Sequence, residues 1–428
     1  MRTIWVCVAV LLWLGASGRT ALAEWTGVVS TQVPMDPNKF SNWLSRWKSY
    51  ISSSARNNRY CDTVMGEDIG WYTQPYLNGF YYGYLATKDA NWVLMEANWA
   101  DSWIKRKLTE PDGYPGWPKV GAAGTDVDKL NSYYADSLLG EAMALTPIVR
   151  MAGEILKTPS LSAVYGAKAQ GYIDLSEQIY SKWASRGAFR DTAGGGAISL
   201  VLPYGIDANT WTWTAKYALR NDPAWGFSHP DNKANKVAMW LTAMWDVTGD
   251  ANYRNHAEDW YTLMKSRMTP LPNGTYQIWN YWQPAGSWDY DPNGNRTKHW
   301  VGVHPNSGYY DIDVTAIVDA YQHGLVFTRV DIDRLVATAL AGHSGWTSQP
   351  YWAALTPYSV DLQRAFEANF PPDSWSGLGT TPWYLSLQVG AIPEPACLAL
   401  MGAAAALLGR RRPRRRPARP TPSARDDG

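Results

Sequence analysis

Hydrophobic residues recur with the period of an α-helix along most of the chain. Between Lys233 and Val247, for example, apolar side chains fall at i, i+3, i+4, i+7 and i+8, which places them on one helical face. The segments with this period are Ser132–Ile155, Ala163–Ala184, Lys233–Val247, Tyr253–Met268, Asp311–Gln322 and Val330–Ala341. The body of the protein is therefore predicted to be mainly α.

A weak internal repeat indicates how these helices are arranged. The sequence TKDANW at 87–92 aligns with TGDANY at 248–253, and both copies lie where one helix ends and the next begins. In both, Asp or Asn can cap the second helix after a tight turn. His323-Gly324 also ends a helix, and Asp331 can cap the one after it. Repeated helical hairpins favour an (α/α) toroid over a globular helical domain with chance similarity.

Three long polar loops interrupt the predicted helices. They cover Thr109–Asp128, Ala188–Trp225 and Pro270–Ser307. Loops of this length inside a compact domain usually carry function. A segment rich in Trp and Pro, residues 350–391, follows the helices and is expected to close the barrel and pack against its side.

Both ends of the chain have the pattern of targeting segments. Arg2 and an apolar stretch precede Ala21-Leu22-Ala23, an A-x-A cleavage site, so residues 1–23 form a predicted signal peptide. Near the other end, Pro393, Glu394 and Pro395 stand before a short apolar run and an arginine cluster at 410–416. The run is shorter than the roughly 20 residues of a full membrane span, and the arginines would stay in the cytoplasm. We therefore assign 24–349 to a helical toroid, 350–391 to the closing segment and 392–428 to a sorting tail.

This tail resembles the PEP-CTERM sorting signal, which exosortase enzymes process in Gram-negative bacteria that make exopolysaccharide. The resemblance implies export to the cell surface or extracellular matrix, transient membrane association through the tail, and an exosortase-type processing enzyme as partner.

Composition points to a carbohydrate partner. The chain has 25 Trp and 26 Tyr but only 7 Phe. Trp and Tyr combine a flat apolar face with a hydrogen-bonding edge, which suits a sugar ring. The formal net charge is +1, and the tail supplies many of the cations, so the mildly acidic body argues against nucleic acid. Cys61 is the one cysteine outside the terminal segments, which excludes an intrachain disulfide.

The densest group of polar and aromatic residues lies between Trp279 and Asp313. Histidine and tyrosine can remove and return a proton at a sugar carbon. The candidates of this stretch are Trp279, Tyr281, Trp282, His299, His304, Tyr309 and Tyr310. A second candidate is His229 with Asn232 at a helix start, where Asn232 is more simply an N-cap.

Carboxylates offer a different chemistry. Glu67 and Asp68, paired with Asp136 or Asp311, could supply the acid and base of glycoside hydrolysis. Arg59 is a candidate clamp for a substrate carboxylate. No cofactor is required by any of these patterns.

One stretch of the sequence resembles part of a calcium-binding loop. Asp289, Asp291, Asn293 and Gly294 fit the first half of a calcium loop, but Trp300 stands where the bidentate Glu belongs. A turn is the simpler interpretation.

The body resembles the toroidal polysaccharide lyases and the related six-hairpin glycosidases. The resemblance rests on the TGD-type turns, His229 with Asn232, Trp279-x-Tyr281, and His304 ahead of Tyr309-Tyr310. It implies His229 or His304 as base, Tyr309 or Tyr310 as acid and Asn232 as neutraliser of a substrate carboxylate.

The expected function is thus that of a secreted polysaccharide lyase cleaving a uronate-containing glycan by β-elimination. Two alternatives stay open: a glycoside hydrolase on the same toroid, and a non-catalytic glycan-binding or matrix protein.

Overall fold

The computed structural model describes residues 32–120, 133–202, 204–215, 226–277, 282–290, 293–294, 307–341 and 352–390. The signal peptide and the sorting motif at 393–395 lie outside these ranges, as do Trp279, Tyr281, Asp291, His299 and His304. In the described part of the chain, no helix is long and apolar enough to cross a membrane.

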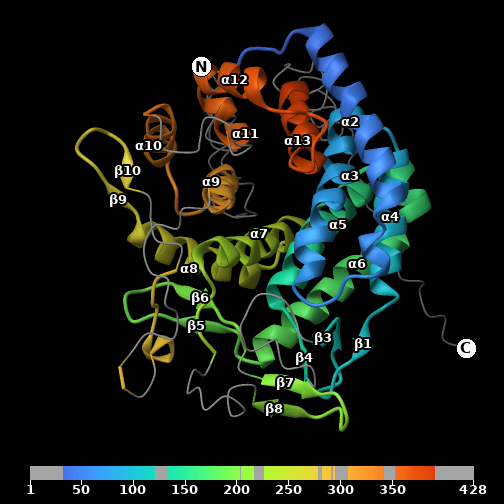
Figure 1. Cartoon of the computed structure of the whole chain (residues 1–428), viewed down its shortest axis with the longest axis vertical. Coiled ribbons are helices and arrows are strands. Elements are labelled where there is room, and N and C mark those ends of the chain that lie inside the picture. The colour runs from blue at the N-terminus through green and yellow to red at the C-terminus, as the bar shows by residue number, and fades with distance from the viewer. Residues whose placement is uncertain are drawn as a thin grey trace, which may run out of the picture.

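Six helices form an inner ring (Figure 1). They are α3 (Gln74–Thr87), α5 (Leu138–Lys157), α7 (Asp231–Thr248), α9 (Ser307–Gln322), α11 (Trp352–Leu355) and α13 (Gly377–Gly390). Each packs against the next, and α13 packs back against α3. The ring is therefore closed, and the predicted (α/α) toroid is confirmed.

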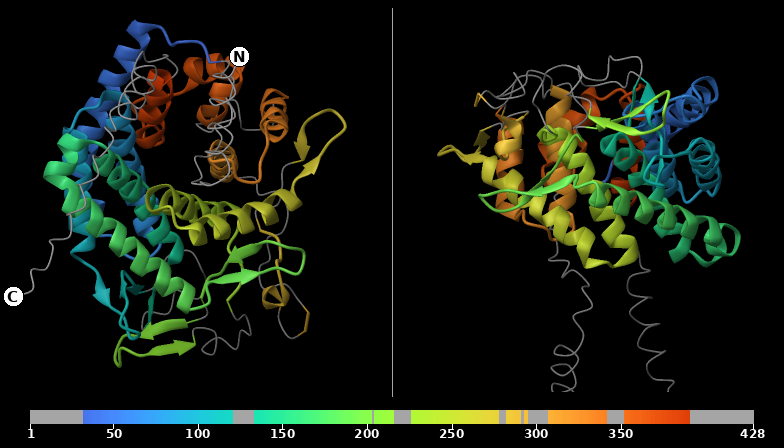
Figure 2. Two further views of the ribbon diagram at one scale, coloured as in Figure 1. Left: turned by 180° about the vertical axis from the view of Figure 1, so that it is seen from behind. Right: turned by 90° about the horizontal axis from the view of Figure 1, so that it is seen from below.

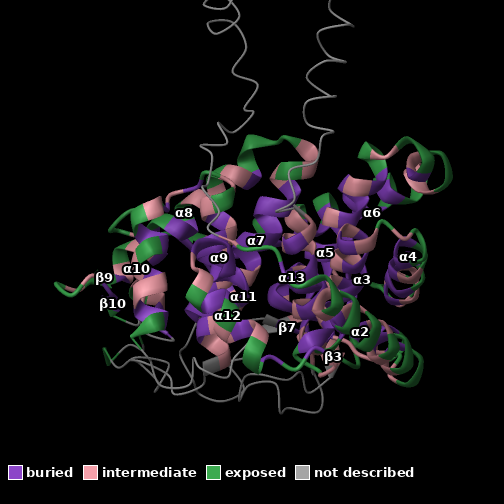
Figure 3. Cartoon of the chain, turned by 90° about the horizontal axis from the view of Figure 1, so that it is seen from above, coloured by how far each residue is buried: buried purple, intermediate pink, exposed green. Residues whose placement is uncertain are grey.

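A second layer of helices surrounds this ring (Figure 2). It consists of α4 (Asn91–Ile104), α6 (Pro159–Ser185), α8 (Ala251–Arg267), α10 (Arg329–Leu340), α12 (Val360–Asn369) and α2 (Pro37–Asn57). The first five each follow and contact one inner helix, whereas α2 packs on α13. Figure 3 shows exposed residues on the outward side of the outer helices and mostly buried residues on the inner ones.

The segment 350–391 does more than pack against the barrel's side. Its helices α11 and α13 are members of the inner ring, so the boundary expected at residue 350 falls inside the toroid. Trp47 Nε1 on α2 donates a hydrogen bond to the Leu378 carbonyl oxygen at 2.9 Å. A Cβ at Gly79 would lie 2.7 Å from that same oxygen, so glycine permits the close approach of α3 to α13.

The two copies of the repeat form the same turn. Thr87 and Thr248 each donate a side-chain hydrogen bond to the carbonyl four residues earlier, and Asp250 caps α8 by accepting from the Asn252 amide. Lys88 and Gly249 both adopt the left-handed conformation, with φ of 54° and 73°. At the third junction Thr328 is the N-cap of α10, and Asp331 completes a capping box instead of capping the helix itself.

Short strands occupy the links that lead into inner helices. The antiparallel sheet β3-β4-β7-β8 consists of Lys119–Val120, Tyr133–Ala135, Tyr204–Asp207 and Trp213–Ala215. The hairpins are β1-β2 (Leu108–Thr109, Pro115–Gly116), β5-β6 (Phe189–Asp191, Ala197–Ser199) and β9-β10 (Thr269–Pro270, Tyr276–Gln277). Short helical turns lie at Tyr60–Asp62 (η1), Ile69–Thr73 (η2), Ser287–Asp289 (η5) and Thr356–Tyr358 (η7).

All inner helices run in one direction, because each is separated from the next by one outer helix. Their amino-terminal ends therefore gather at one end of the toroid, together with the three long links that precede α5, α7 and α9. The tight turns lie at the opposite end. This end of converging amino termini favours bound negative charge.

The shared turn gives a prediction with a matched control. Gly249→Ala should lower the free energy of unfolding by about 1 kcal/mol, because a Cβ disfavours the left-handed conformation. Lys88→Ala should change it by less than about 0.5 kcal/mol, since that position already carries a Cβ at the same φ. Urea unfolding of both variants checks this, and equal losses would contradict it.

Candidate active site

The inner helices enclose a cavity of about 250 Å³. Its lining comes from five of the six inner helices and from the segment before α13. The lining side chains are Gln74, Pro75, Asn78 and Tyr82 of α3, Thr146 and Arg150 of α5, Lys236 and Met239 of α7, Asp311, Ile312 and Thr315 of α9, Gly379, Thr380 and Trp383 of α13, and Trp375 and Ser376. Gln74, Pro75, Gly379 and Thr380 lie in the first turns of α3 and α13, whereas Thr146 and Arg150 lie in the third and fourth turns of α5, so the cavity reaches from the amino-terminal ends toward the middle of the ring.

Asp311 and Lys236 bring opposite charges to this cavity without forming a close ion pair. The Asp311 carboxyl accepts one long hydrogen bond, 3.4 Å from Thr315 Oγ1. Burial raises the pKa of Asp311 to about 6, although the positive charge of Lys236 opposes the rise. Burial also lowers the pKa of Lys236, whose Nζ forms no hydrogen bond or ion pair with the described residues. Both groups are therefore available to a ligand.

Arg150 is held in place by other protein groups. Its Nη2 lies 2.9 and 3.0 Å from the two carboxylate oxygens of Asp319, and its Nη1 donates to Tyr82 Oη at 3.2 Å. Because a guanidinium can only donate, the Tyr82 oxygen accepts and its own hydrogen stays available to a ligand. His323 contacts the backbone of Asp319 and a second carboxylate. Its Nδ1 lies 2.6 Å from the Asp319 carbonyl oxygen, and its Nε2 lies 2.7 Å from Asp246 Oδ2.

Aromatic rings form much of the cavity wall. Tyr82 and Trp383 lie with ring centroids 6.0 Å apart, and Trp375 adds a third ring. Gln74 and Asn78 place amide groups among them. Flat apolar faces next to hydrogen-bonding groups match the two kinds of surface on a sugar ring.

The described proton-transfer candidates of the sequence lie elsewhere. His229 is buried, with Nδ1 2.9 Å from Ser199 Oγ. Tyr309 and Tyr310 precede Asp311 on α9 but do not line the cavity, and burial raises the pKa of Tyr310 to about 12. Successive helical residues point about 100° apart, so Tyr309 and Tyr310 face other directions than Asp311 does.

The substrate-binding candidates are also outside the cavity lining. Asn232 is buried in the first turn of α7 and is not its N-cap, because Pro230 occupies that position. Arg59 pairs with Asp62 at 3.0 Å and lies over Trp99 on the outer side of the ring. Trp282 is fully buried and donates to the Ser228 carbonyl.

The calcium-like sequence forms a turn at its described residues. Asp289 is buried and accepts hydrogen bonds from the Ser228 amide and hydroxyl and from the Ala285 amide. Within the part of the chain that the structure describes, no three His, Cys, Asp or Glu side chains come close enough to hold a metal ion.

Of the four carboxylates proposed for hydrolysis, only Asp311 lines the cavity. Glu67 binds Lys233 Nζ at 2.7 Å and Trp71 Nε1 at 2.9 Å, and Asp68 pairs with Lys119. Asp136 belongs to a buried group of charges outside the ring. These three carboxylates therefore have structural partners already.

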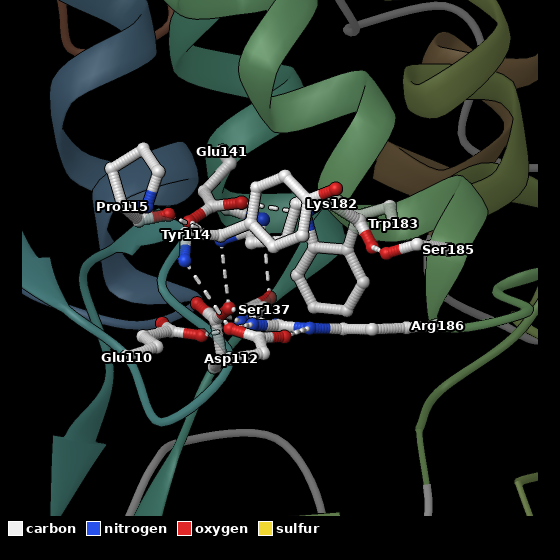
Figure 4. A network of polar contacts seen from close by, with 12 residues as sticks. Glu110, Asp112, Tyr114, Pro115, Ser137, Glu141, Lys182, Trp183, Ser185 and Arg186 are labelled. Atoms are coloured by element: carbon white, nitrogen blue, oxygen red, sulfur yellow. Dashed lines mark hydrogen bonds and ion pairs between the residues drawn. The ribbon is translucent and has the colours of Figure 1, made fainter.

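The buried charges join the β1-β2 hairpin to α5 and α6 (Figure 4). Lys182 lies 2.8 Å from Asp136 and 2.7 Å from Glu141, and Arg186 binds Asp136 and Glu110. Burial and the negative charge of Asp136 raise the pKa of Glu110 to about 9 and of Glu141 to about 8. The two cations overcome the effect of burial at Asp136, whose pKa is lowered.

Sequence reasoning missed Arg150, Lys236 and Tyr82. One pattern in the sequence could have indicated them: polar residues spaced four apart on helices that are otherwise apolar, as in Asn78 with Tyr82 and Thr146 with Arg150. A charged residue in the middle of an apolar helix suggests a functional interior, but only if that helix is known to face a cavity.

The buried charges predict a strong effect of one substitution. Lys182→Met should lower the free energy of unfolding by about 3–5 kcal/mol, because Asp136 loses a buried counter-charge and Glu141 loses a hydrogen-bond donor. Lys168→Met removes a lysine that is paired with Asp101 at the surface and should change it by less than about 1 kcal/mol. Denaturant titration at pH 7 compares them, and similar losses would contradict a structural role for the cluster.

Asp311 predicts a stability that depends on pH. Because its folded-state pKa is raised, ionisation disfavours the folded form, and the free energy of unfolding falls between about pH 4 and pH 6. Asp311→Asn should remove that fall and add about 1–3 kcal/mol at pH 8, but little at pH 4. Unfolding at both pH values tests this, and a variant that is equally destabilised at both would contradict it.

No family model matches the sequence, and no curated protein sequence matches it. Among solved structures, the chain is similar to an inactive variant of an α-1,6-mannanase from Salegentibacter in complex with an α-1,6-linked mannose tetramer. The identity is 10%, the match covers 81% of this chain and 97% of the other, and the TM-score is 0.44. The chain is also similar to a family 76 glycoside hydrolase (mannosidase) from Bacteroides thetaiotaomicron. The identity is 12%, the match covers 85% of this chain and 100% of the other, and the TM-score is 0.45.

A cellobiose 2-epimerase from Bacillus thermoamylovorans is similar to the same extent, with 12% identity, 81% and 85% coverage and a TM-score of 0.41. At such identities and TM-scores, these similarities transfer no activity to this chain, and the chemistry must be argued from its own residues.

Proposed function

We propose that this protein is a glycoside hydrolase that binds a glycan in the central cavity and uses Asp311 as its general acid. The observation that carries the proposal is the Asp311 carboxyl itself. It has a pKa of about 6 and lies among aromatic and amide side chains in the cavity.

The proposed step is proton transfer to the glycosidic oxygen. Protonated Asp311 donates its proton as the bond from the anomeric carbon to that oxygen breaks. Water then adds to the anomeric carbon and releases a proton, which the Asp311 carboxylate takes up. A carboxylic acid with a pKa near the working pH is suited to this, because it is protonated before the step and can be reprotonated after it. The nearby Lys236 keeps the Asp311 pKa below the value that burial alone would give.

Lys236 and Tyr82 would orient the substrate. Lys236, which has no ion-pair partner among the described residues, favours an anionic sugar, and this supports a uronate-containing glycan as the substrate class. The Tyr82 hydroxyl, fixed by Arg150, donates to a sugar oxygen.

Hydrolysis fits the cavity better than β-elimination does. The elimination candidates among the described residues, His229, Tyr309 and Tyr310, do not line it. A raised carboxyl pKa inside a cavity is typical of catalytic acids, which favours a catalyst over a purely binding protein.

We propose from the terminal sequences that this activity is exported. The predicted signal peptide and the PEP-CTERM-like tail would place the protein at the cell surface or in the extracellular matrix, where polysaccharide substrates occur.

Turnover on a panel of neutral and uronate-containing polysaccharides tests the proposal. We expect reducing ends without ultraviolet-absorbing unsaturated products, and a rate that declines above about pH 6 as Asp311 loses its proton. Asp311→Asn should lower the rate at least about 100-fold, while Asp361→Asn, at an exposed site, should leave it unchanged.

Two results would count against hydrolysis. Unsaturated products would identify a lyase, and an Asp311→Asn variant with full activity would show that another group is the acid.

A further inference from the structure

Exposed aromatic rings gather beside the cavity. Tyr72 and Trp375 are each 42% exposed, although both are large side chains with apolar faces. Their ring centroids lie 6.5 Å apart, and Tyr60 lies 5.1 Å from Tyr72 and 6.2 Å from Trp375. We refer to Tyr60, Tyr72 and Trp375 as the aromatic shelf.

The shelf is continuous with the cavity. Trp375 lines the cavity and also contacts both tyrosines of the shelf. The ring centroid of the buried Tyr76 lies 5.8 Å from that of Trp375 and 6.1 Å from that of Tyr60. Packing against Tyr76 therefore holds two rings of the shelf in place. A glycan that leaves the cavity past Trp375 therefore meets Tyr72 and Tyr60 next.

An unusual backbone segment holds Tyr72 in place. It belongs to η2, a single π-helical turn directly before α3, and such turns often occur at functional sites. The turn is pressed against α5, because a Cβ at Gly70 would lie 2.7 Å from Met143 Sδ and one at Gly140 would lie 2.4 Å from the Gly66 carbonyl oxygen. This tight packing fixes the backbone that carries an exposed ring.

We propose that the aromatic shelf binds a sugar ring of the glycan outside the cavity. Exposed Tyr and Trp faces stack on the C–H face of a sugar, and the tyrosine hydroxyls can bond to its rim. The inference rests on the proposed function only for the class of ligand, a glycan. It adds that the protein should distinguish long glycans from short ones, because only a long chain fills the cavity and the shelf together.

Binding without turnover tests the shelf directly. In an Asp311→Asn background, retention would be measured by affinity electrophoresis in gels that contain polygalacturonate, alginate, xylan or yeast mannan. On the polymers that retain the parent protein, Tyr72→Ala should weaken binding about 10-fold, and Tyr72→Phe should keep most of it. Tyr290→Ala removes a tyrosine of similar exposure, 41%, outside the shelf and should have no effect.

Chain length supplies a second measurement. Binding of a disaccharide from the same polymer, measured by calorimetry, should be equal for the parent and Tyr72→Ala, since a disaccharide fills only the cavity.

If Tyr72→Ala is retained by the polymers as strongly as the parent protein, the proposal that the aromatic shelf binds a sugar is wrong. It is also wrong if none of the four polymers retains the parent protein. The proposed hydrolysis fails separately: if Tyr72→Ala weakens retention but the unmodified protein cleaves none of the polymers, the shelf stands and the hydrolase does not.

Discussion

Closure of the inner ring between α13 and α3 is the constraint on which the cavity depends. Five helical hairpins follow each other along the chain, but the sixth pair is made of α13 and α2, from opposite ends of the described body. Trp47 and Gly79 secure that seam through the Leu378 carbonyl. Without α13, the cavity would lose Gly379, Thr380 and Trp383 from its lining and would open along one side.

The protein handles its buried charges in two ways. Around Lys182 and Arg186, carboxylates and cations satisfy each other, so their role is to hold a hairpin against the helices. In the cavity, Arg150 is paired with Asp319, but Asp311 and Lys236 are not within ion-pair distance of each other. Two opposite charges that face the same cavity without pairing lower the stability there, as active sites commonly do.

The helical period predicted α5 to α10, including α5 and α7, which are buried on most faces, but α2, which buries a single face, was not among the predicted helices. The helix expected at 233–247 is observed at Asp231–Thr248, because its apolar positions follow the helical period. By contrast, α3 and α13 contain glycine, proline and many aromatic residues, and their apolar and polar positions do not alternate with a clear helical period. The candidate site was harder to predict than the helices. The chemistry of single residues pointed to His229 and Tyr310, but a cavity is formed by contacts between segments that are distant in the sequence. Asp311 entered only through the hydrolase alternative, and nothing local in the sequence marks Arg150 as its neighbour across the ring.

The pairing of α2 with α13 also has a consequence for folding, since it joins the two ends of the described body. The Val33 amide bonds to the Gln363 side chain and the Met35 amide to that of Gln388, contacts that join residues 330 and 353 positions apart. Contacts of such long range form late and slow the folding of a chain. Until they form, the apolar flank of α3 is open to solvent and to other unfolded molecules. The cavity therefore stays incomplete until α13 has packed against α3, and binding of the proposed glycan should report that the ring has closed.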